Sequence, residues 1–303
     1  MKKPISRHLK AVLLAVLVTF IWSTSWIFIK FGLKEIPPLT FAGLRYFLAF
    51  LCLFPFLFQK DNLNQVKHFH KSDWIQLILL GIVSYSFAQG FQYLGLSFLP
   101  TVTVGLLLNL TSLFVAFSGM FVLKEKPSSL QWFGVGVNLL GILIYFLPIG
   151  FQNGGWLGFL FVGISLLANI VGSLQGRAIN RSEKYNVLVV TIISMGIGST
   201  IMLVSGLIMQ GLPKISLTGW GIVFLLAVLN TAFAFTVWNY IQRTLPAMES
   251  SFINSTNIVQ IAILSWIFLG EKLTGREIFG LALTVLGVLI VQINIRPKLP
   301  KTH

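Results

Sequence analysis

Charged residues are scarce in this sequence of 303 residues, at 10% against 55% hydrophobic residues. A soluble globular domain carries about a quarter charged residues, so this composition excludes a soluble protein. Apolar stretches of roughly 20 residues recur along the whole chain, which is the length of a helix that spans a bilayer. The strands of a membrane β-barrel would instead alternate over segments of ~10 residues. We therefore expect an all-α integral membrane protein.

Cysteine and histidine are also scarce. The single thiol, Cys52, excludes a disulfide framework and a cysteine-based metal site. The histidines all fall in predicted loops or tails: His8, His68, His70 and His303. No aspartate falls in a predicted span, and the H-E-x-x-H and G-x-x-x-x-G-K-[ST] motifs are absent. We expect no metal, no cofactor and no catalytic residue.

Acidic residues are few as well, eight against 22 basic ones, which leaves a net charge of +14. The basic residues lie in short segments between apolar runs, as the positive-inside bias produces, so we expect no nucleic-acid partner. Turn signals separate ten predicted helices. These cover residues 10–31, 39–58, 74–96, 100–122, 130–147, 155–175, 187–209, 217–241, 247–269 and 276–293. A basic tail, residues 294–303, follows them.

Loop charges predict the orientation of the chain. With the N-terminus inside, the inside segments carry sixteen Lys and Arg residues and the outside loops carry four. The sequence therefore predicts a multi-pass protein of the cell membrane, the inner membrane of a bacterium, with both termini cytoplasmic. The first apolar run, residues 11–29, is too long for a signal peptide and is expected to be the first span.

The chain repeats itself at an offset of 146 residues, without a gap across residues 100–147 and 246–293. The matches include Pro100 with Pro246, Glu125 with Glu271, Lys126 with Lys272, Gly134 with Gly280 and Gly141 with Gly287. The heptad-spaced glycines predict close helix packing. Two five-helix repeats follow, residues 10–147 and 155–293, and because five is odd the second repeat is inverted. Inverted repeats are typical of transporters.

Several residues resemble the EamA family of the drug/metabolite transporter superfamily. They are Trp22, Lys30, Pro37-Pro38, Arg45, Tyr93 to Leu96 and Leu123 to Glu125, then Trp238 to Tyr240, Pro246 and Leu269 to Glu271. The resemblance covers nearly the whole chain and implies transport of a small solute. The sequence departs from the family pattern at Thr111 and Asn257, where the family often has proline. Arg45 also has no counterpart in the second repeat.

Polar side chains within a bilayer need partners or a wet cavity. The predicted solute-binding residues are Trp22, Ser23, Gln89, Tyr93, Asn109, Asn169, Asn230, Trp238, Asn254 and Asn257. We expect them to line a central cavity between the first, third, fourth, sixth, eighth and ninth helices, as the resemblance also implies. The alternative is a structural role, in hydrogen bonds between helices for the polar residues and in ordinary packing for the aromatic ones.

Three charged residues fall in or beside the predicted spans. Lys30 can snorkel to the outer surface, and Arg45, ~10 Å into the second helix, is expected to pair with carbonyls or helix ends as a structural charge. Glu249, one turn from the inner surface, is the candidate coupling residue. Glu271 and its counterpart Glu125 are expected to be solvated helix ends. With no carboxylate or histidine at the midplane, we expect facilitated diffusion or solute exchange.

The predicted function is a secondary transporter or facilitator for a small neutral or zwitterionic organic solute. An amino acid or a related metabolite fits, in the direction of uptake or efflux. A membrane-embedded enzyme and a channel, each acting on a small hydrophobic solute, are the alternatives. The expected partners are the solute and the lipid bilayer, with the protein a monomer or a homodimer.

Overall fold

All regular secondary structure in the described chain is helical. The computed structural model describes residues 7–123, 128–147, 155–181, 184–242, 245, 253–254 and 256–293. The first-half helices are α1 (Arg7–Gly32), α2 (Pro38–Leu53), η1 (Phe54–Phe58), α3 (Lys60–Lys67), α4 (Lys71–Gly81), η2 (Ile82–Phe87), α5 (Ala88–Phe98), α6 (Thr101–Leu123) and α7 (Ser129–Phe146). The second half contains α8 (Gly155–Arg181), α9 (Val187–Gln210), α10 (Leu217–Ala227), η3 (Val228–Phe233), α11 (Ala234–Gln242), α13 (Asn257–Leu269) and α14 (Gly275–Ile293). Each of the ten predicted ranges contains a helix, which confirms the all-α prediction. Glu249 and residues 294–303 lie outside the described residues.

Several helices are long and apolar enough to cross a membrane. They cover residues 8–32, 38–58, 71–98, 155–176 and 187–210, and shorter apolar helices accompany them. Large apolar side chains face outward: Ile208 is 79% exposed, Met209 74% and Leu217 91%. Apolar surface of this extent is unfavourable in water and favourable in lipid.

Helix boundaries repeat at the 146-residue offset that the sequence predicts. α4 begins at Lys71 and α10 at Leu217, and α7 begins at Ser129 and α14 at Gly275. Between α4 and α5 the chain forms the π-helix η2, and between α10 and α11 it forms the π-helix η3, again 146 residues later. Because π-helical turns are rare, their agreement in register extends the repeat back to residue 71.

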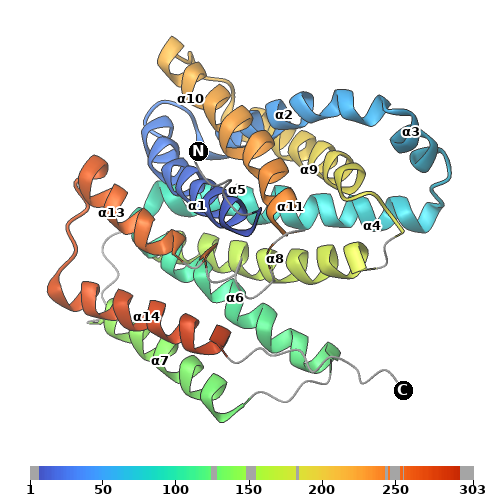
Figure 1. The fold of residues 1–303 in the computed structure, drawn as a ribbon. Helices are drawn as coiled ribbons and strands as arrows, with labels where there is room; N and C mark the ends of the chain where they lie inside the picture. Colours follow the sequence, from blue (N-terminus) through green and yellow to red (C-terminus); the bar gives the residue numbers. More distant parts are fainter. Residues whose placement is uncertain are drawn as a thin grey trace, which may run out of the picture.

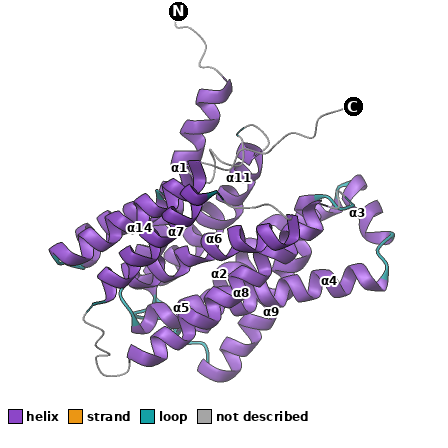
Figure 2. Cartoon of the chain, turned by 90° about the horizontal axis from the view of Figure 1, so that it is seen from below, coloured by secondary structure: helices purple, strands orange, loops and turns teal. Residues whose placement is uncertain are grey.

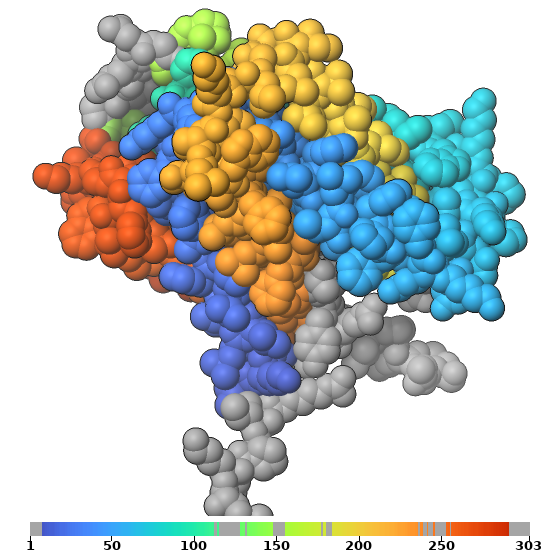
Figure 3. All heavy atoms as spheres, turned by 90° about the horizontal axis from the view of Figure 1, so that it is seen from above, coloured from blue at the N-terminus to red at the C-terminus, as the bar shows by residue number. Residues whose placement is uncertain are grey.

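Helix packing is also preserved when the two halves are exchanged. α2 packs on α9 and α7 on α14, so each of these helices meets its own counterpart (Figure 1). α5 packs against α8 as α11 packs against α1, and α4 against α9 as α10 against α2. Figure 3 shows α10 and α11, in orange, lying against α1 and α2, in blue. The two halves are therefore duplicated units whose helices interleave.

Small residues bring α7 and α14 close together. A Cβ on Gly141 would lie 2.5 Å from the backbone nitrogen of Thr284, and one on Gly287 would lie 2.3 Å from that of Asn138. These two contacts are equivalent under the repeat, since Gly287 matches Gly141 and Thr284 matches Asn138. The Asn138 amide also donates to the Thr284 carbonyl at 3.0 Å. The close packing predicted for these glycines is confirmed.

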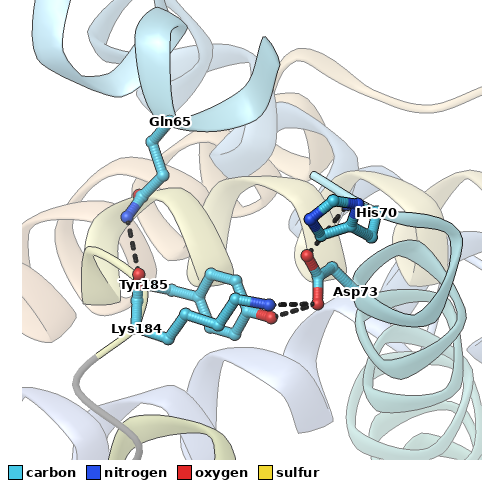
Figure 4. A network of polar contacts seen from close by, with 5 residues as sticks. All are labelled: Gln65, His70, Asp73, Lys184 and Tyr185. Atoms are coloured by element: carbon cyan, nitrogen blue, oxygen red, sulfur yellow. Dashed lines mark hydrogen bonds and ion pairs between the residues drawn. The ribbon is translucent and has the colours of Figure 1, made fainter. Parts of the chain in front are cut away.

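A polar network joins the halves at one end of the bundle. Gln65 Nε2 donates to the Lys184 carbonyl at 3.1 Å, and the Asn186 backbone N–H donates to Gln65 Oε1 at 3.0 Å. Lys184 Nζ donates to Asp73 Oδ1 at 2.8 Å, and the Tyr185 hydroxyl donates to the same oxygen (Figure 4). The Asp73 carboxylate that accepts this bond raises the pKa of Lys184. We call these five residues the Asp73 network.

The polarity of residues 59–73, which include Gln65, predicted a loop. Part of this segment is helical instead. α3 forms within residues 59–73, packs against η1 and is joined to α4 by a short loop (Figure 2). The second half has no equivalent helix, because only residues 211–216 separate α9 from α10. At the other end of the bundle this shorter segment is bound to the α1–α2 connection. There Glu35 accepts hydrogen bonds from the backbone and hydroxyl of Ser216, and Thr40 Oγ1 donates to the Gly211 carbonyl at 3.0 Å.

Candidate solute-binding site

A buried arginine lies where the two halves meet. Arg45 on α2 is 5% exposed. Its Nε donates to Thr231 Oγ1 on η3 at 3.0 Å, and its Nη1 donates to the Tyr93 hydroxyl on α5 at 3.1 Å. Its guanidinium lies over the ring of Tyr46, 5.1 Å from the centroid. Within the described residues its partners are therefore hydroxyls and a ring, where the sequence predicted carbonyls or helix ends.

Two predicted site residues belong to this cluster. Tyr93 is fully buried, with its ring edge-on to Phe41 at 5.3 Å between centroids. Gln89 lies one turn earlier on α5, and its Oε1 accepts a hydrogen bond from the Tyr46 hydroxyl at 2.7 Å. We call Arg45, Tyr46, Gln89, Tyr93 and Thr231 the Arg45 cluster. Tyr46 and Thr231 were not predicted as site residues, although they directly follow Arg45 and Asn230, which the sequence singles out.

Asn230, also predicted, binds η3 to α1. Its Nδ2 donates to Ser25 Oγ at 2.8 Å, to Thr24 Oγ1 at 3.2 Å and to the Ile21 carbonyl. Its Oδ1 is buried without a hydrogen-bond partner in the described part of the chain. An unpaired buried acceptor is energetically unfavourable.

A second polar cluster lies between α1 and α13. Ser23 Oγ lies 2.8 Å from both the Thr19 carbonyl and Gln260 Oε1. Asn257 Nδ2 donates to the same Thr19 carbonyl at 3.0 Å. We call Thr19, Ser23, Asn257 and Gln260 the Thr19 cluster. Gln260 was missed, although its spacing of three residues from Asn257 places it on the same helix face.

The predicted aromatic residues Trp22 and Trp238 lie together, with their ring centroids 5.1 Å apart. Phe235 extends the group, 5.6 Å from Trp22. Such tilted aromatic pairs contribute about 0.5–1.5 kcal/mol beyond the burial of their area. These rings join α1 of the first half to α11 of the second half.

The other predicted polar residues have different surroundings. Asn169 Nδ2 donates to the Ser165 carbonyl on its own helix at 2.8 Å, while Ser165 Oγ donates to the Ala88 carbonyl at 2.6 Å. This contact joins α8 to α5. Asn109 is half-buried and has a bonding partner. Asn254 is exposed, unlike Asn257, which is half-buried.

Lys30 and Glu271 form contacts that their positions in the sequence did not suggest. Lys30 Nζ donates to the Leu99 carbonyl at 2.7 Å, beyond the end of α5. The Glu271 carboxylate accepts from the backbone N–H groups of Thr101 at 2.9 Å and Val102 at 3.3 Å. Glu271 therefore caps the N-terminus of α6, where a negative charge is favourable, and is not simply solvated.

The polar clusters share one geometric property, since each connects helices of the first half to helices of the second. The Arg45 cluster joins α2 and α5 to η3, and the Thr19 cluster joins α1 to α13. The described residues include no group of three His, Cys, Asp or Glu side chains able to hold a metal. The chemistry that these clusters offer is hydrogen bonding and ion pairing at contacts between the two halves.

Apolar helices in two duplicated halves, with polar side chains gathered where the halves meet, define a multi-pass membrane transporter. A family model described as "EamA-like transporter family" matches residues 9–147 and again residues 156–293. The chain belongs to this family, within the drug/metabolite transporter superfamily.

Relatives and a solved structure agree with this assignment. The chain is 28% identical over 289 residues to "Uncharacterized transporter YoaV" of Bacillus subtilis, covering 92% of this chain and 95% of that protein. It is 27% identical over 300 residues to a "Probable amino-acid metabolite efflux pump" of Escherichia coli, covering 93% and 95%. A solved structure at 18% identity matches with a TM-score of 0.67 over 94% of this chain and 98% of its own, which shows the shared fold.

Family membership identifies the protein as a transporter and not an enzyme, so the alternative of a membrane-embedded enzyme is wrong. It also implies a small-molecule substrate and a lipid bilayer as partners.

Proposed function

We propose that the protein is a secondary transporter or facilitator that moves a small neutral or zwitterionic organic solute by alternating access. Ten membrane-spanning helices form two inverted halves, residues 10–147 and 155–293, with both termini cytoplasmic and the chain in the inner membrane. The observation that carries this proposal is the repeat in register of two π-helices, η2 and η3, each packed against the opposite half. Two duplicated halves of opposite orientation can exchange conformations, opening a shared site to each side in turn.

The proposed site contains the predicted residues Trp22, Ser23, Gln89, Tyr93, Asn109, Asn169, Asn230, Trp238, Asn254 and Asn257. A zwitterion suits the two successive η3 residues, because Thr231 belongs to a donor-rich cluster and Asn230 presents an unpaired acceptor. The name of the Escherichia coli relative, a probable amino-acid metabolite efflux pump, supports an amino acid as the first solute to test.

We further propose uncoupled exchange or facilitated diffusion. The described carboxylates Glu35, Asp61, Asp73, Glu271 and Glu277 all lie in connections or at helix ends, where a proton-carrying role deep in the bilayer is not available to them. Glu249 is the residue that would carry a proton if coupling exists.

Counterflow in proteoliposomes tests the proposal. Liposomes with the purified protein are loaded with one unlabelled amino acid at a time, and labelled amino acid is added outside without an ion gradient. We expect transient accumulation of the label for at least one amino acid, and none in liposomes without protein. A panel in which no amino acid exchanges would refute the solute class. Accumulation that requires a pH step and is lost in Glu249→Gln would refute uncoupled transport.

A further inference from the structure

The Arg45 guanidinium lies inside the bundle without a counter-ion in the described part of the chain. Arginine stays protonated in proteins, and none of the described carboxylates forms an ion pair with Arg45. Among the described residues, the ion pair is the one between Lys184 and Asp73, which belongs to the Asp73 network. A buried charge of this kind is unfavourable unless it is paired. Hydroxyls and an aromatic ring offset part of this penalty, and they leave the charge itself unneutralised.

Around Arg45 the donors outnumber the acceptors. The Thr231 hydroxyl donates its proton to the Leu226 carbonyl at 2.9 Å, and it therefore accepts from Arg45. The Tyr93 hydroxyl accepts from Arg45, and its own proton has no acceptor in the described residues. Gln89 accepts from Tyr46 through Oε1, which leaves its Nε2 group without an acceptor in the same part of the chain.

The Arg45 cluster therefore contains three donor groups that have no acceptor in the described chain. They are the Arg45 Nη2 group, the Tyr93 hydroxyl and the Gln89 amide. A negatively charged group that only accepts hydrogen bonds supplies the charge and the acceptors that this cluster lacks. A carboxylate has two acceptor oxygens with about four lone-pair sites, and the planar guanidinium binds it through two parallel hydrogen bonds.

We infer that the Arg45 cluster binds the carboxylate of the transported solute. This inference rests on the proposed transport function and narrows its substrate class to solutes that carry a carboxylate. Thr231 links the cluster to a relative movement of the two halves, because η3 belongs to the second half whereas α2 and α5 belong to the first. Separation of η3 from α2 releases Arg45 Nε from Thr231 and opens the guanidinium to the solute.

Matched acid and amide probes test the inference by direct binding to the purified full-length protein. The probes are leucine with leucinamide and phenylalanine with phenylalaninamide, which differ in the carboxylate and share the side chain. We expect each acid to bind at least about tenfold more tightly than its amide. In Arg45→Gln this preference should disappear through weaker acid binding, while Arg45→Lys retains part of it. The control Lys34→Gln removes an exposed cation and should leave the preference unchanged.

A structural role for Arg45 predicts a different outcome. Arg45→Gln would then weaken acids and amides by the same factor and lower the unfolding temperature, and the unmodified protein would show no acid preference. That last result overturns the inference without any variant, so a variant that fails to fold does not rescue it.

Counterflow with the same probes separates this inference from the proposed function. Acids that bind with an Arg45-dependent preference and do not exchange would refute transport of these solutes and retain the carboxylate site. Acids and amides that exchange equally would retain transport and refute the carboxylate site. Probes that neither bind nor exchange would refute both.

Discussion

The contact between α7 and α14 makes a quantitative prediction about Gly141. A Cβ at this position would lie 2.5 Å from the Thr284 backbone nitrogen and 2.6 Å from the Gly280 carbonyl oxygen. Ordinary contact needs ~3.5 Å, so the helices would have to separate by about 1 Å. Because backbone atoms cannot rotate away, we expect Gly141→Ala to destabilise the protein by about 1–3 kcal/mol, the usual range for overpacking.

Gly136 on the same helix is the matched control, since a Cβ there would meet no atom within 4 Å. Gly136→Ala should be neutral or stabilising by up to ~1 kcal/mol, because alanine is the better helix former. The assay is thermal unfolding of each purified variant in the same detergent. Equal unfolding temperatures for Gly141→Ala and Gly136→Ala would refute the close approach.

The repeat adds a prediction about the equivalent residue, Gly287. Gly287→Ala should destabilise the protein by a similar amount, because its Cβ would lie 2.6 Å from the Gly134 carbonyl oxygen. The double variant should lose less than the sum of the two, since helices already separated by one methyl group accommodate the second. Strictly additive losses would indicate that the two contacts are independent.

Further predictions concern the helix cap, the Asp73 network and the Thr19 cluster. Glu271→Ala should lower the free energy of unfolding by about 0.5–2 kcal/mol through loss of the α6 cap. Lys272→Ala, at the exposed neighbouring position, should not. Equal unfolding temperatures for the two variants would contradict the cap. Asp73→Asn should lower the unfolding temperature more than Asp61→Asn, because Asp73 accepts hydrogen bonds from two segments and Asp61 is exposed; the reverse order would exclude a stabilising network. Asn257→Leu should reduce counterflow while expression and unfolding temperature stay near those of the unmodified protein, and unchanged counterflow would remove the Thr19 cluster from the site.

The sequence predicted the helices because each apolar run is long and bounded by strong turn signals. α6 illustrates this, since Pro100 precedes its first residue, Thr101. The internal repeat was visible because Pro, Glu and Gly matches are rare enough to be significant. The π-helices were not predictable, because no residue type specifies a π turn.

Individual site residues were harder to predict than helices. Gln89, Tyr93 and Asn230 could be selected because polar groups in apolar runs are conspicuous, and the structure gives them partners across helices. Their grouping depends on which helix faces meet, which a single sequence does not contain. The same limit applies to Lys30, whose reach to the Leu99 carbonyl joins residues 69 positions apart.

The central claim is that two equivalent halves cross the membrane in opposite orientations, and one labelling experiment tests it directly. His68 and Lys214 are both exposed and differ by the 146-residue offset, since they precede α4 and α10 by the same distance. Each is replaced by cysteine on a Cys52→Ser background and treated in intact cells with a membrane-impermeant thiol reagent. We predict labelling of Lys214→Cys in intact cells and of His68→Cys only after the membrane is opened. Labelling of both positions from the same side would contradict the inverted arrangement and the alternating access that depends on it.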